Sequence, residues 1–344
     1  MIKNRWSRRA VMAAVLAGAV ATGASAQSAE DFYTGKTLTV VVASATGSAS
    51  DFFARQVAPY LTKYMPGHPD VLVLNEPGAG GLKEGMLLQQ RGPFDGSTIA
   101  LLQSNNFTAP ILDDGIAFRP REMSWLGSLN SEVYTVVARS DAPVKTYEDL
   151  FTTPLILGAT SYQHDSRMIP AMMNEYMGTK FDIVTGYEGN AAVGLALERG
   201  EVEARMQTAN TLLSGEVRHL VEAGELTVVA QAATRGAKEF PDLKNMIDFA
   251  TDDLSRGVAN FILSPLVAGR PFAAPAGVPE DRIEALREAF DKAAADPEFL
   301  AGMEQLNAQV NYVSGTEVQQ IVQDLWDAKP EVVEAVKTLA TPPS

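Results

Sequence analysis

The sequence contains no cysteine and only three histidines, His68, His164 and His219, among its 344 residues. Without cysteine the chain has neither a disulfide framework nor a thiol nucleophile, and three scattered histidines do not make a zinc site. We therefore expect no bound metal. The protein must bury a hydrophobic core that is stable without cross-links, and its length is sufficient for two such domains.

Long hydrophobic runs are also missing, apart from a short one near the N-terminus. Four basic residues precede an apolar stretch at residues 10–22, and Ala24-Ser-Ala26 follows it. This order is typical of a cleavable signal peptide, so we expect residues 1–26 to be removed on export to the periplasm. The apolar stretch is too short to span a membrane. Ser7-Arg8-Arg9 resembles part of a twin-arginine signal, but the pattern is incomplete and general secretion is the preferred route.

Positive charge is scarce. The chain has 28 Lys and Arg against 42 Asp and Glu, a net charge of −14, which becomes about −18 without the four basic residues of the leader. Such a surface argues against nucleic acid or an anionic membrane as a partner. It does not exclude an anionic ligand, because surface charges farther than about 8 Å are largely screened at physiological salt. Helix N-termini and hydroxyl groups can also bind an anion without net positive charge.

The stretch Val40–Arg55 has the pattern of a strand, a turn of small residues and a capped helix. Leu38–Val42 is apolar and largely β-branched, residues 43–49 are all small, and either Ser50 or Asp51 is the expected N-cap. The free N–H groups at such a helix start can bind an anion. An ordinary strand-to-helix turn explains this stretch alone equally well.

The order of strand, small or polar loop and helix recurs along the chain. Val71–Leu74 leads into a turn with glycines at 78, 80 and 81, and residues 98–102 lead into Gln103–Asn106. Further strands are expected at 155–157, 181–184, 259–263 and 272–274. In open α/β sheets, ligands bind outside the carboxyl ends of the strands.

We therefore predict an α/β protein with two domains, each a mostly parallel sheet flanked by helices, and a ligand cleft between them. The expected first domain comprises residues 27–137 and 259–344, and the second comprises residues 138–258.

No motif for catalysis or for a cofactor is present. The glycines at 78–81 lack the lysine of a phosphate loop and the spacing of a dinucleotide fingerprint, so we expect no cofactor. No G-x-S-x-G motif occurs, and the adjacent His164, Asp165 and Ser166 are not expected to meet as a triad. A binding protein is favoured over an enzyme. The alternative is an exported α/β hydrolase or lyase that uses Asp51 or Glu188 as a base.

In their order and spacing, several short motifs resemble those of the periplasmic substrate-binding proteins of tripartite tricarboxylate transporters, also called Bug receptors. The resemblance covers nearly all of the chain after residue 26, and its motifs are Asp51-Phe-Phe-Ala-Arg55, Asn75-Glu-Pro-Gly-Ala-Gly-Gly81, Asp95-Gly96, Gly186-Tyr-Glu-Gly189, Glu201-Val-Glu203, Ala223-Gly-Glu-Leu226, Ala274-Pro-Ala-Gly-Val-Pro279 and Asp296-Pro297. It implies a two-domain receptor of the type II-like periplasmic binding fold that closes on a small carboxylic acid. The receptor would deliver this acid to the membrane subunits of a transporter, and we expect a monomer.

The resemblance also implies a set of ligand-binding residues. In the first domain they are Gly47, Ser48, Ser50, Gly80, Gly81, Ser104 and Asn105, and in the second they are Thr160, Ser161, Asp165 and Ser166. Arg205 is the basic residue expected near the loop ends, where a guanidinium could hold a carboxylate bidentately. A surface ion pair with Glu201 or Glu203 is an equal alternative for it.

The sequence departs from the family in two turns. Residues 45–50 contain one glycine where the family usually has a run of glycines, and the turn 158–166 departs from the usual glycine- and serine-rich form. We expect Ser48 and Ser50 to set the ligand preference, because they stand where relatives carry glycine-rich backbone.

Overall fold

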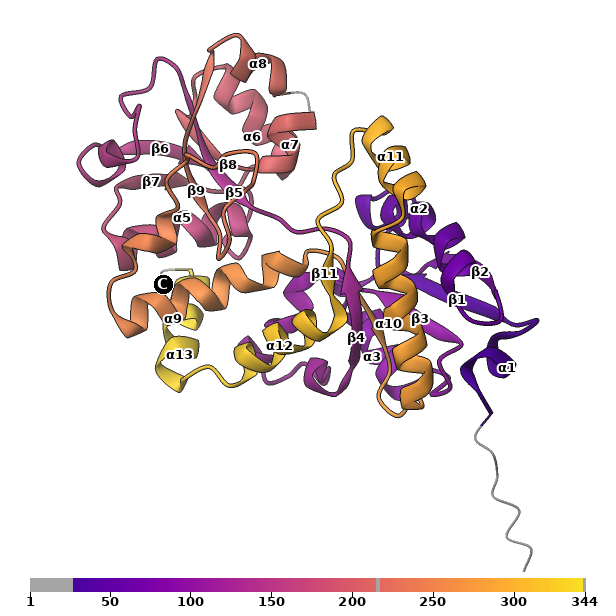
Figure 1. Cartoon of the computed structure of the whole chain (residues 1–344). Helices are drawn as coiled ribbons and strands as arrows, with labels where there is room; N and C mark the ends of the chain where they lie inside the picture. Colours follow the sequence, from indigo (N-terminus) through magenta and orange to yellow (C-terminus); the bar gives the residue numbers. More distant parts are fainter. Residues whose placement is uncertain (1–26, 215–216, 343–344) are drawn as a thin grey trace, which may run out of the picture.

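The computed structural model describes residues 27–214 and 217–342, so the expected signal peptide lies outside the described part. The strands form two separate sheets, which lie at the upper left and at the right of Figure 1. Among the described residues, no helix combines the length and hydrophobicity needed to cross a bilayer.

The first domain is built on a six-stranded sheet in the order β11-β4-β10-β3-β1-β2. Its strands are β1 (Thr37–Val42), β2 (Asp70–Asn75), β3 (Thr98–Leu101), β4 (Ser124–Ser128), β10 (Pro271–Ala274) and β11 (Val313–Ser314). Strand β1 pairs in parallel with β2 and β3, whereas β10 runs antiparallel to β3 and β4.

The second domain is built on a five-stranded sheet in the order β7-β6-β8-β5-β9. Its strands are β5 (Tyr134–Arg139), β6 (Leu155–Gly158), β7 (Phe181–Val184), β8 (Ala204–Thr208) and β9 (Leu226–Ala232). Strand β6 is parallel to β7 and β8, and β5 is antiparallel to β8 and β9.

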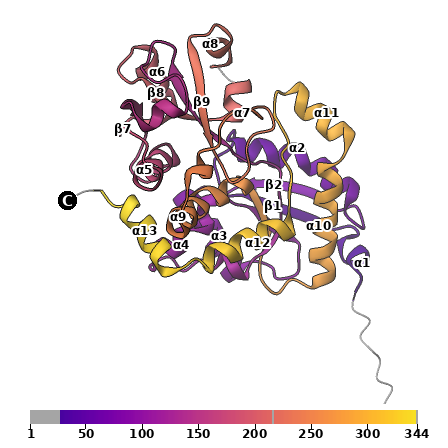
Figure 2. The same ribbon diagram turned by 60° about the vertical axis from the view of Figure 1, so that its left-hand side comes forward.

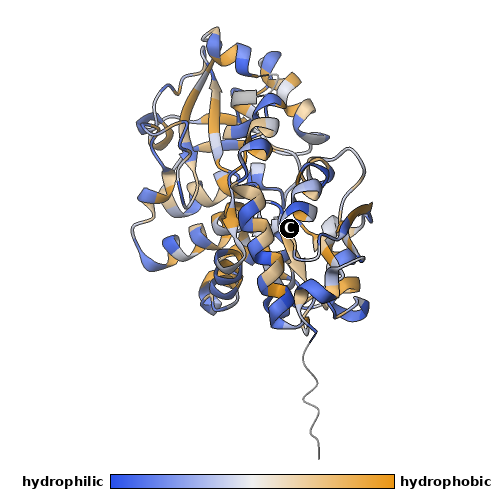
Figure 3. Ribbon diagram, turned by 45° about the vertical axis from the view of Figure 1, so that its right-hand side comes forward, coloured by the Kyte–Doolittle hydropathy of each residue, from blue (hydrophilic) through white to orange (hydrophobic). Residues whose placement is uncertain are grey.

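Helices flank both sheets and connect them. They are α1 (Ala29–Tyr33), α2 (Ala49–Tyr64), α3 (Leu82–Arg91), α4 (Ala109–Leu112), α5 (Asp165–Met177), α6 (Gly189–Glu198), α7 (Ala209–Ser214), α8 (Arg218–Glu222), α9 (Asp253–Leu263), α10 (Glu280–Ala294), α11 (Pro297–Gln305), α12 (Gly315–Trp326) and α13 (Pro330–Ala340). Their amphipathic sequences explain this placement, since Phe53, Val57 and Leu61 recur on the buried face of α2, which packs against α10. Figure 3 shows hydrophobic strands inside and hydrophilic helix surfaces outside.

Two segments carry the chain between the sheets. Residues 129–133 lead from β4 to β5, and residues 264–270 lead from α9 back to β10. We call them the crossing segments. They are hydrogen-bonded side by side, with Glu132 N donating to Leu266 O at 2.8 Å and Gly269 N to Asn130 O at 3.0 Å. The domain divisions expected at residues 137 and 258 fall instead inside β5 and α9.

Two C-terminal elements also join the domains. Helix α9 packs against α5 of the second domain, and α13 contacts α9, α5 and α4. Figure 2 shows α13 beside α9, close to the lower end of the second domain. Buried residues of both sheets and of α9 therefore belong to one continuous hydrophobic cluster.

The predicted α/β class with two domains is confirmed, with two corrections to local elements. Each sheet is mixed, since β10 and β11 in the first and β5 in the second run antiparallel to their neighbours, while the other strands of each sheet run in one direction. Residues 259–263 are the end of α9, not a strand, because Asp252 and Ser255 form a capping box that starts a helix there. The N-cap of α2 is Ser48, not Ser50 or Asp51.

Candidate functional site

The loop after β1 is held together by its own side chains. The Ser48 hydroxyl accepts a hydrogen bond from Asp51 N at 3.2 Å and lies 2.7 Å from the Ser44 hydroxyl. Gly47, with a φ of +82°, donates its N–H to Asp51 Oδ2 at 2.8 Å. The backbone N–H of Ser48 donates to Ala45 O at 3.1 Å, so the backbone donors of both Gly47 and Ser48 are already engaged within the loop. The N–H groups of Ala49 and Ser50, in the first turn of α2, have no acceptor among the described residues.

The loops after β2 and β3 lie against each other. Asn106 Nδ2 donates to Gly80 O at 2.9 Å, and a Cβ added at Gly81 would lie 2.7 Å from Asn106 Oδ1. Gly81 also has a φ of +92°, so glycine is required there for two reasons. A Cβ at Gly80 would be 3.3 Å from Asn105 Nδ2. The structure therefore brings Gly80, Gly81 and Asn105 together.

The expected residues of the second domain gather at the start of α5. Ser166 is buried, and its hydroxyl lies 3.2 Å from both the N–H and the hydroxyl of Thr160. It also lies 3.0 Å from His164 Nδ1, a contact between neighbours that we did not expect. His164 is the N-cap of α5 and accepts from Ser166 N at 3.1 Å. The contact between His164 and Ser166 thus caps α5. Ser161 is exposed in the turn before this helix.

The side chain of Arg205 lies against α6, although its position in β8 pairs with Gly158, near the turn that leads to α5. It is only 6% exposed, its Nη1 would be 2.9 Å from a Cβ on Gly194 of α6, and its Nε has no partner among the described residues. Burial lowers the pKa of its guanidinium. The surface ion pair is absent within the described chain, since Glu203 instead accepts from Ile156 N at 2.9 Å and Glu201 faces Arg199. Arg205 lies under α6 because alternate residues of β8 point to opposite faces of the sheet.

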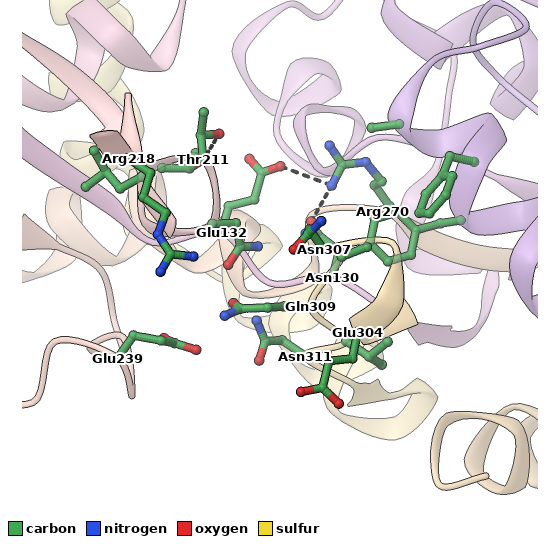
Figure 4. Close-up of a pocket in the computed structure, with 18 of the residues that line it drawn as sticks. Asn130, Glu132, Thr211, Arg218, Glu239, Arg270, Glu304, Asn307, Gln309 and Asn311 are labelled. Carbon is green, nitrogen blue, oxygen red and sulfur yellow. Dashed lines mark hydrogen bonds and ion pairs between the residues drawn. The ribbon is translucent and has the colours of Figure 1, made fainter. Parts of the chain in front are cut away.

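A cavity of about 880 Å³ opens between the domains (Figure 4). We call it the larger cavity. Its walls are the first turns of α2, the crossing segments, the region of α7 and α8, and the loop that follows α11. Ala49 is adjacent to the expected Ser48 and Ser50 and lines it. A second cavity, of about 580 Å³, is lined by Ser104, Asn105 and Asp165 together with apolar residues of α4, α9 and α13.

A charged residue that no sequence motif indicates, Arg270, lines the larger cavity. Arg270 Nη1 donates to Asn130 Oδ1 at 2.5 Å and lies 3.2 Å from Glu132 Oε1, and its guanidinium is 5.6 Å from the Phe53 ring centre. All three polar residues come from the crossing segments, which carry no motif. Only the pairing of the two segments brings them together.

Asp165 has a carboxyl group whose pKa is raised to about 6. Burial is the largest cause and the charge of Glu132 adds to it, whereas His164 and a hydrogen bond with Tyr134 oppose it. Hydrogen bonds in this turn join His164 and Ser166 to each other, and Asp165 forms none with either of them among the described residues.

We expect Asp165→Asn to change the pH dependence of stability. Between about pH 4 and pH 6 the unfolded chain loses the Asp165 proton while the folded protein keeps it, so wild-type stability falls as pH rises through this window. The free energy of unfolding of the variant should not fall in this window. Relative to wild type, the variant should therefore be more stable above pH 6 than it is at pH 4. Urea unfolding of both proteins at several pH values from 4 to 7 measures the difference. Parallel profiles would contradict the assignment.

Two α/β domains joined by paired crossing segments, with a cavity between them, define a two-domain solute-binding protein. The chain belongs to the tripartite tricarboxylate transporter receptors, because the family described as "Tripartite tricarboxylate transporter family receptor" matches residues 53–337. This confirms the family that the motifs indicated.

The chain is also similar to a curated relative and shares its fold with solved structures. A protein of Agrobacterium vitis, the UPF0065 protein in the TAR-I ttuE-ttuC' intergenic region, is 28% identical over 277 residues, which are 78% of this chain and 74% of the relative. The structure of a TctC solute-binding protein from Polaromonas is 20% identical with a TM-score of 0.71, covering 89% of this chain and 98% of the other. MatC from Rhodopseudomonas palustris with bound malate is 19% identical with a TM-score of 0.55. The match covers 89% of this chain and 99% of the MatC chain.

Proposed function

We propose that this protein is a periplasmic receptor that binds a small organic acid between its domains and delivers it to the membrane subunits of a tripartite tricarboxylate-type transporter. Membership of the receptor family is the observation that carries the proposal. The malate bound to MatC supports a carboxylate as the class of ligand. The basic leader sequence supports export to the periplasm. We also propose that the protein acts as a monomer and that it does not catalyse a reaction of its ligand.

The loops after β1, β2 and β3 and the turn before α5 supply hydrogen-bond donors for such a ligand. The unpaired N–H groups of Ala49 and Ser50 lie at the positive end of α2, where an anion is stabilised. We propose that Ser50, Gly80, Gly81, Ser104 and Asn105 bind from the first domain. Thr160, Ser161, Asp165 and Ser166 would bind from the second domain once the domains close. Gly47 and Ser48 would act by shaping the loop, since their donors are engaged within it.

Closure would occur about the crossing segments, because they are the short paired connections between the sheets. The continuous hydrophobic cluster through α9 would stay packed and limit the movement to a rotation.

Thermal unfolding against a panel of mono-, di- and tricarboxylates tests the proposal. A ligand present at 100 times its dissociation constant should stabilise the fold by about 2.7 kcal/mol, because it binds the folded state only. The same acid should lower the radius of gyration in small-angle scattering, whereas glycerol at equal concentration should change neither quantity. If no acid raises the midpoint, or if an acid is chemically converted, the receptor function is wrong.

A further inference from the structure

Arg270 lines the larger cavity, and one edge of its guanidinium has no hydrogen-bond partner among the described residues. Its Nη1 is held by Asn130 and Glu132, whereas Nε and Nη2 have no partner among the described residues and are not shielded from solvent. Figure 4 shows the guanidinium beside Glu132 and Asn130, within the group of polar side chains that line the cavity. The Nε–Nη2 edge offers two parallel N–H groups, which is the geometry that binds a carboxylate bidentately.

The surroundings hold Arg270 in place before any ligand arrives. Its backbone N donates to Ser128 Oγ at 3.3 Å, and its guanidinium lies over the ring of Phe53. The preceding Gly269 has no room for a side chain, since a Cβ there would lie 2.4 Å from Asn130 Oδ1. Only 20% of the Arg270 side chain is exposed, so little rotamer entropy remains to be lost on binding.

The rest of the larger cavity disfavours a second carboxylate on the ligand. Four carboxylates line it, namely Glu132, Glu222, Glu239 and Glu304. Arg218, the other guanidinium in the lining, is engaged by Glu222 at 2.8 Å. A second ligand carboxylate would therefore meet more negative than positive charge.

Uncharged hydrogen-bonding groups are plentiful in the same lining. Five amide side chains line the cavity, and they belong to Asn130, Asn210, Asn307, Gln309 and Asn311. The amide oxygens can accept hydrogen bonds from hydroxyl groups of a ligand, and the amide NH2 groups can donate to them.

We propose that Arg270 binds the single carboxylate of a hydroxylated monocarboxylic acid, with the amides of the larger cavity binding its hydroxyl groups. This inference rests on the proposed function, a receptor for a carboxylate, and adds a ligand class and an anchoring residue. It places the ligand in the larger cavity, which Ala49 lines, in place of contacts with Ser104, Asn105 and Asp165, which line the second cavity. Asn130 and Glu132 position the guanidinium. The acidic lining selects against di- and tricarboxylates.

Titration calorimetry with gluconate as the probe tests the inference on the purified wild-type protein and its variants. Gluconate should bind wild type, whereas hexanoate, which lacks hydroxyl groups, and citrate should bind at least tenfold more weakly. Arg270→Gln should weaken gluconate binding 10- to 100-fold, and Arg270→Lys should weaken it less because lysine keeps the charge but not the two parallel donors. Arg121→Gln, which removes an exposed Arg121–Asp327 pair, is the matched control and should bind as wild type.

The outcomes separate this inference from the proposed function. If wild type binds citrate or malate in preference to gluconate, or if folded Arg270→Gln binds gluconate as wild type does, the inference is wrong while the carboxylate receptor stands. If no acid of the panel binds wild type, both are wrong. Circular dichroism of each variant confirms that lost binding does not reflect lost folding, and Arg270→Lys decides the matter if Arg270→Gln is unfolded.

Discussion

Replacement of Asp51 by alanine is expected to lower the free energy of unfolding by about 2–3 kcal/mol, because hydrogen bonds to a charged group are among the stronger ones. Asp51 is 4% exposed, and its carboxylate accepts from Gly47 N at 2.8 Å and from Arg55 Nε at 2.9 Å. Arg55 in turn reaches Asn75 Oδ1 at 2.9 Å. The side chain thus joins the loop after β1 to the end of β2, and its loss should also weaken ligand binding.

The pH dependence provides a second measure of the role of Asp51. The hydrogen bond from Arg55 is the largest of the effects that hold the pKa of its carboxyl below the usual range, with the Gly47 N–H adding to it. Its stabilisation is therefore present above the ordinary carboxyl pKa and is lost as pH falls through the lower folded value. Asp51→Asn keeps an acceptor for Gly47 without the charge and should fall between wild type and Asp51→Ala. Urea unfolding at pH 7 and pH 3 measures these differences. If the free energy of unfolding of Asp51→Ala at pH 7 lies within about 0.5 kcal/mol of wild type, as is usual for surface substitutions, Asp51 does not have this stabilising role.

Replacement of Trp125 by alanine is expected to cost about 3–5 kcal/mol, the usual range for a fully buried tryptophan. Trp125 is 0% exposed, its ring meets the edge of Phe107 with centroids 4.9 Å apart, and its Nε1 donates to Pro120 O at 3.0 Å. Phe107 ends the short helical turn that begins at Ser104, so the cavity left by the substitution should also loosen this cleft loop.

Chemical unfolding of Trp125→Ala at neutral pH gives the size of the effect. Leu195→Ala is the matched control, because Leu195 is 51% exposed on α6 and its loss should change stability by no more than about 0.5 kcal/mol. Equal losses in the two variants would show that burial does not account for the contribution of Trp125. Hydrogen exchange should be faster at residues 104–107 in Trp125→Ala than in wild type.

Much of the architecture followed from local patterns in the sequence. The alternation of β-branched runs, small-residue turns and amphipathic segments was sufficient for the α/β class and for the family, since each is set by neighbours close in the chain. The sequence predicts a strand at 259–263 where the structure has a helix, because a short apolar run fits a buried strand or a helix equally well. The capping box of Asp252 and Ser255 decided for the helix.

The site depended much more on contacts between distant residues. The loops after β2 and β3 converge, as Gly80 and Asn105 show, because parallel strands bring their carboxyl ends to one edge of the sheet. The sequence does not predict that the Arg205 side chain lies against α6. The face of the sheet from which a residue of β8 projects depends on the register between the strands. The sequence does not indicate that Asn130, Glu132 and Arg270 lie together. Asn130 and Arg270 are 140 residues apart, and only the pairing of the crossing segments brings them into contact.

The sequence by itself therefore determined the α/β elements, the family and the turns of the cleft, because helix caps, glycine turns and hydrophobic periodicity act over a few residues. The tertiary structure alone decided which donors are already engaged, as with Gly47 and Ser48, and which are open, as with the guanidinium edge of Arg270. Hydrogen-bond partners and charge neighbours are contributed by segments far apart in the chain, and their pairing exists only once both domains have folded.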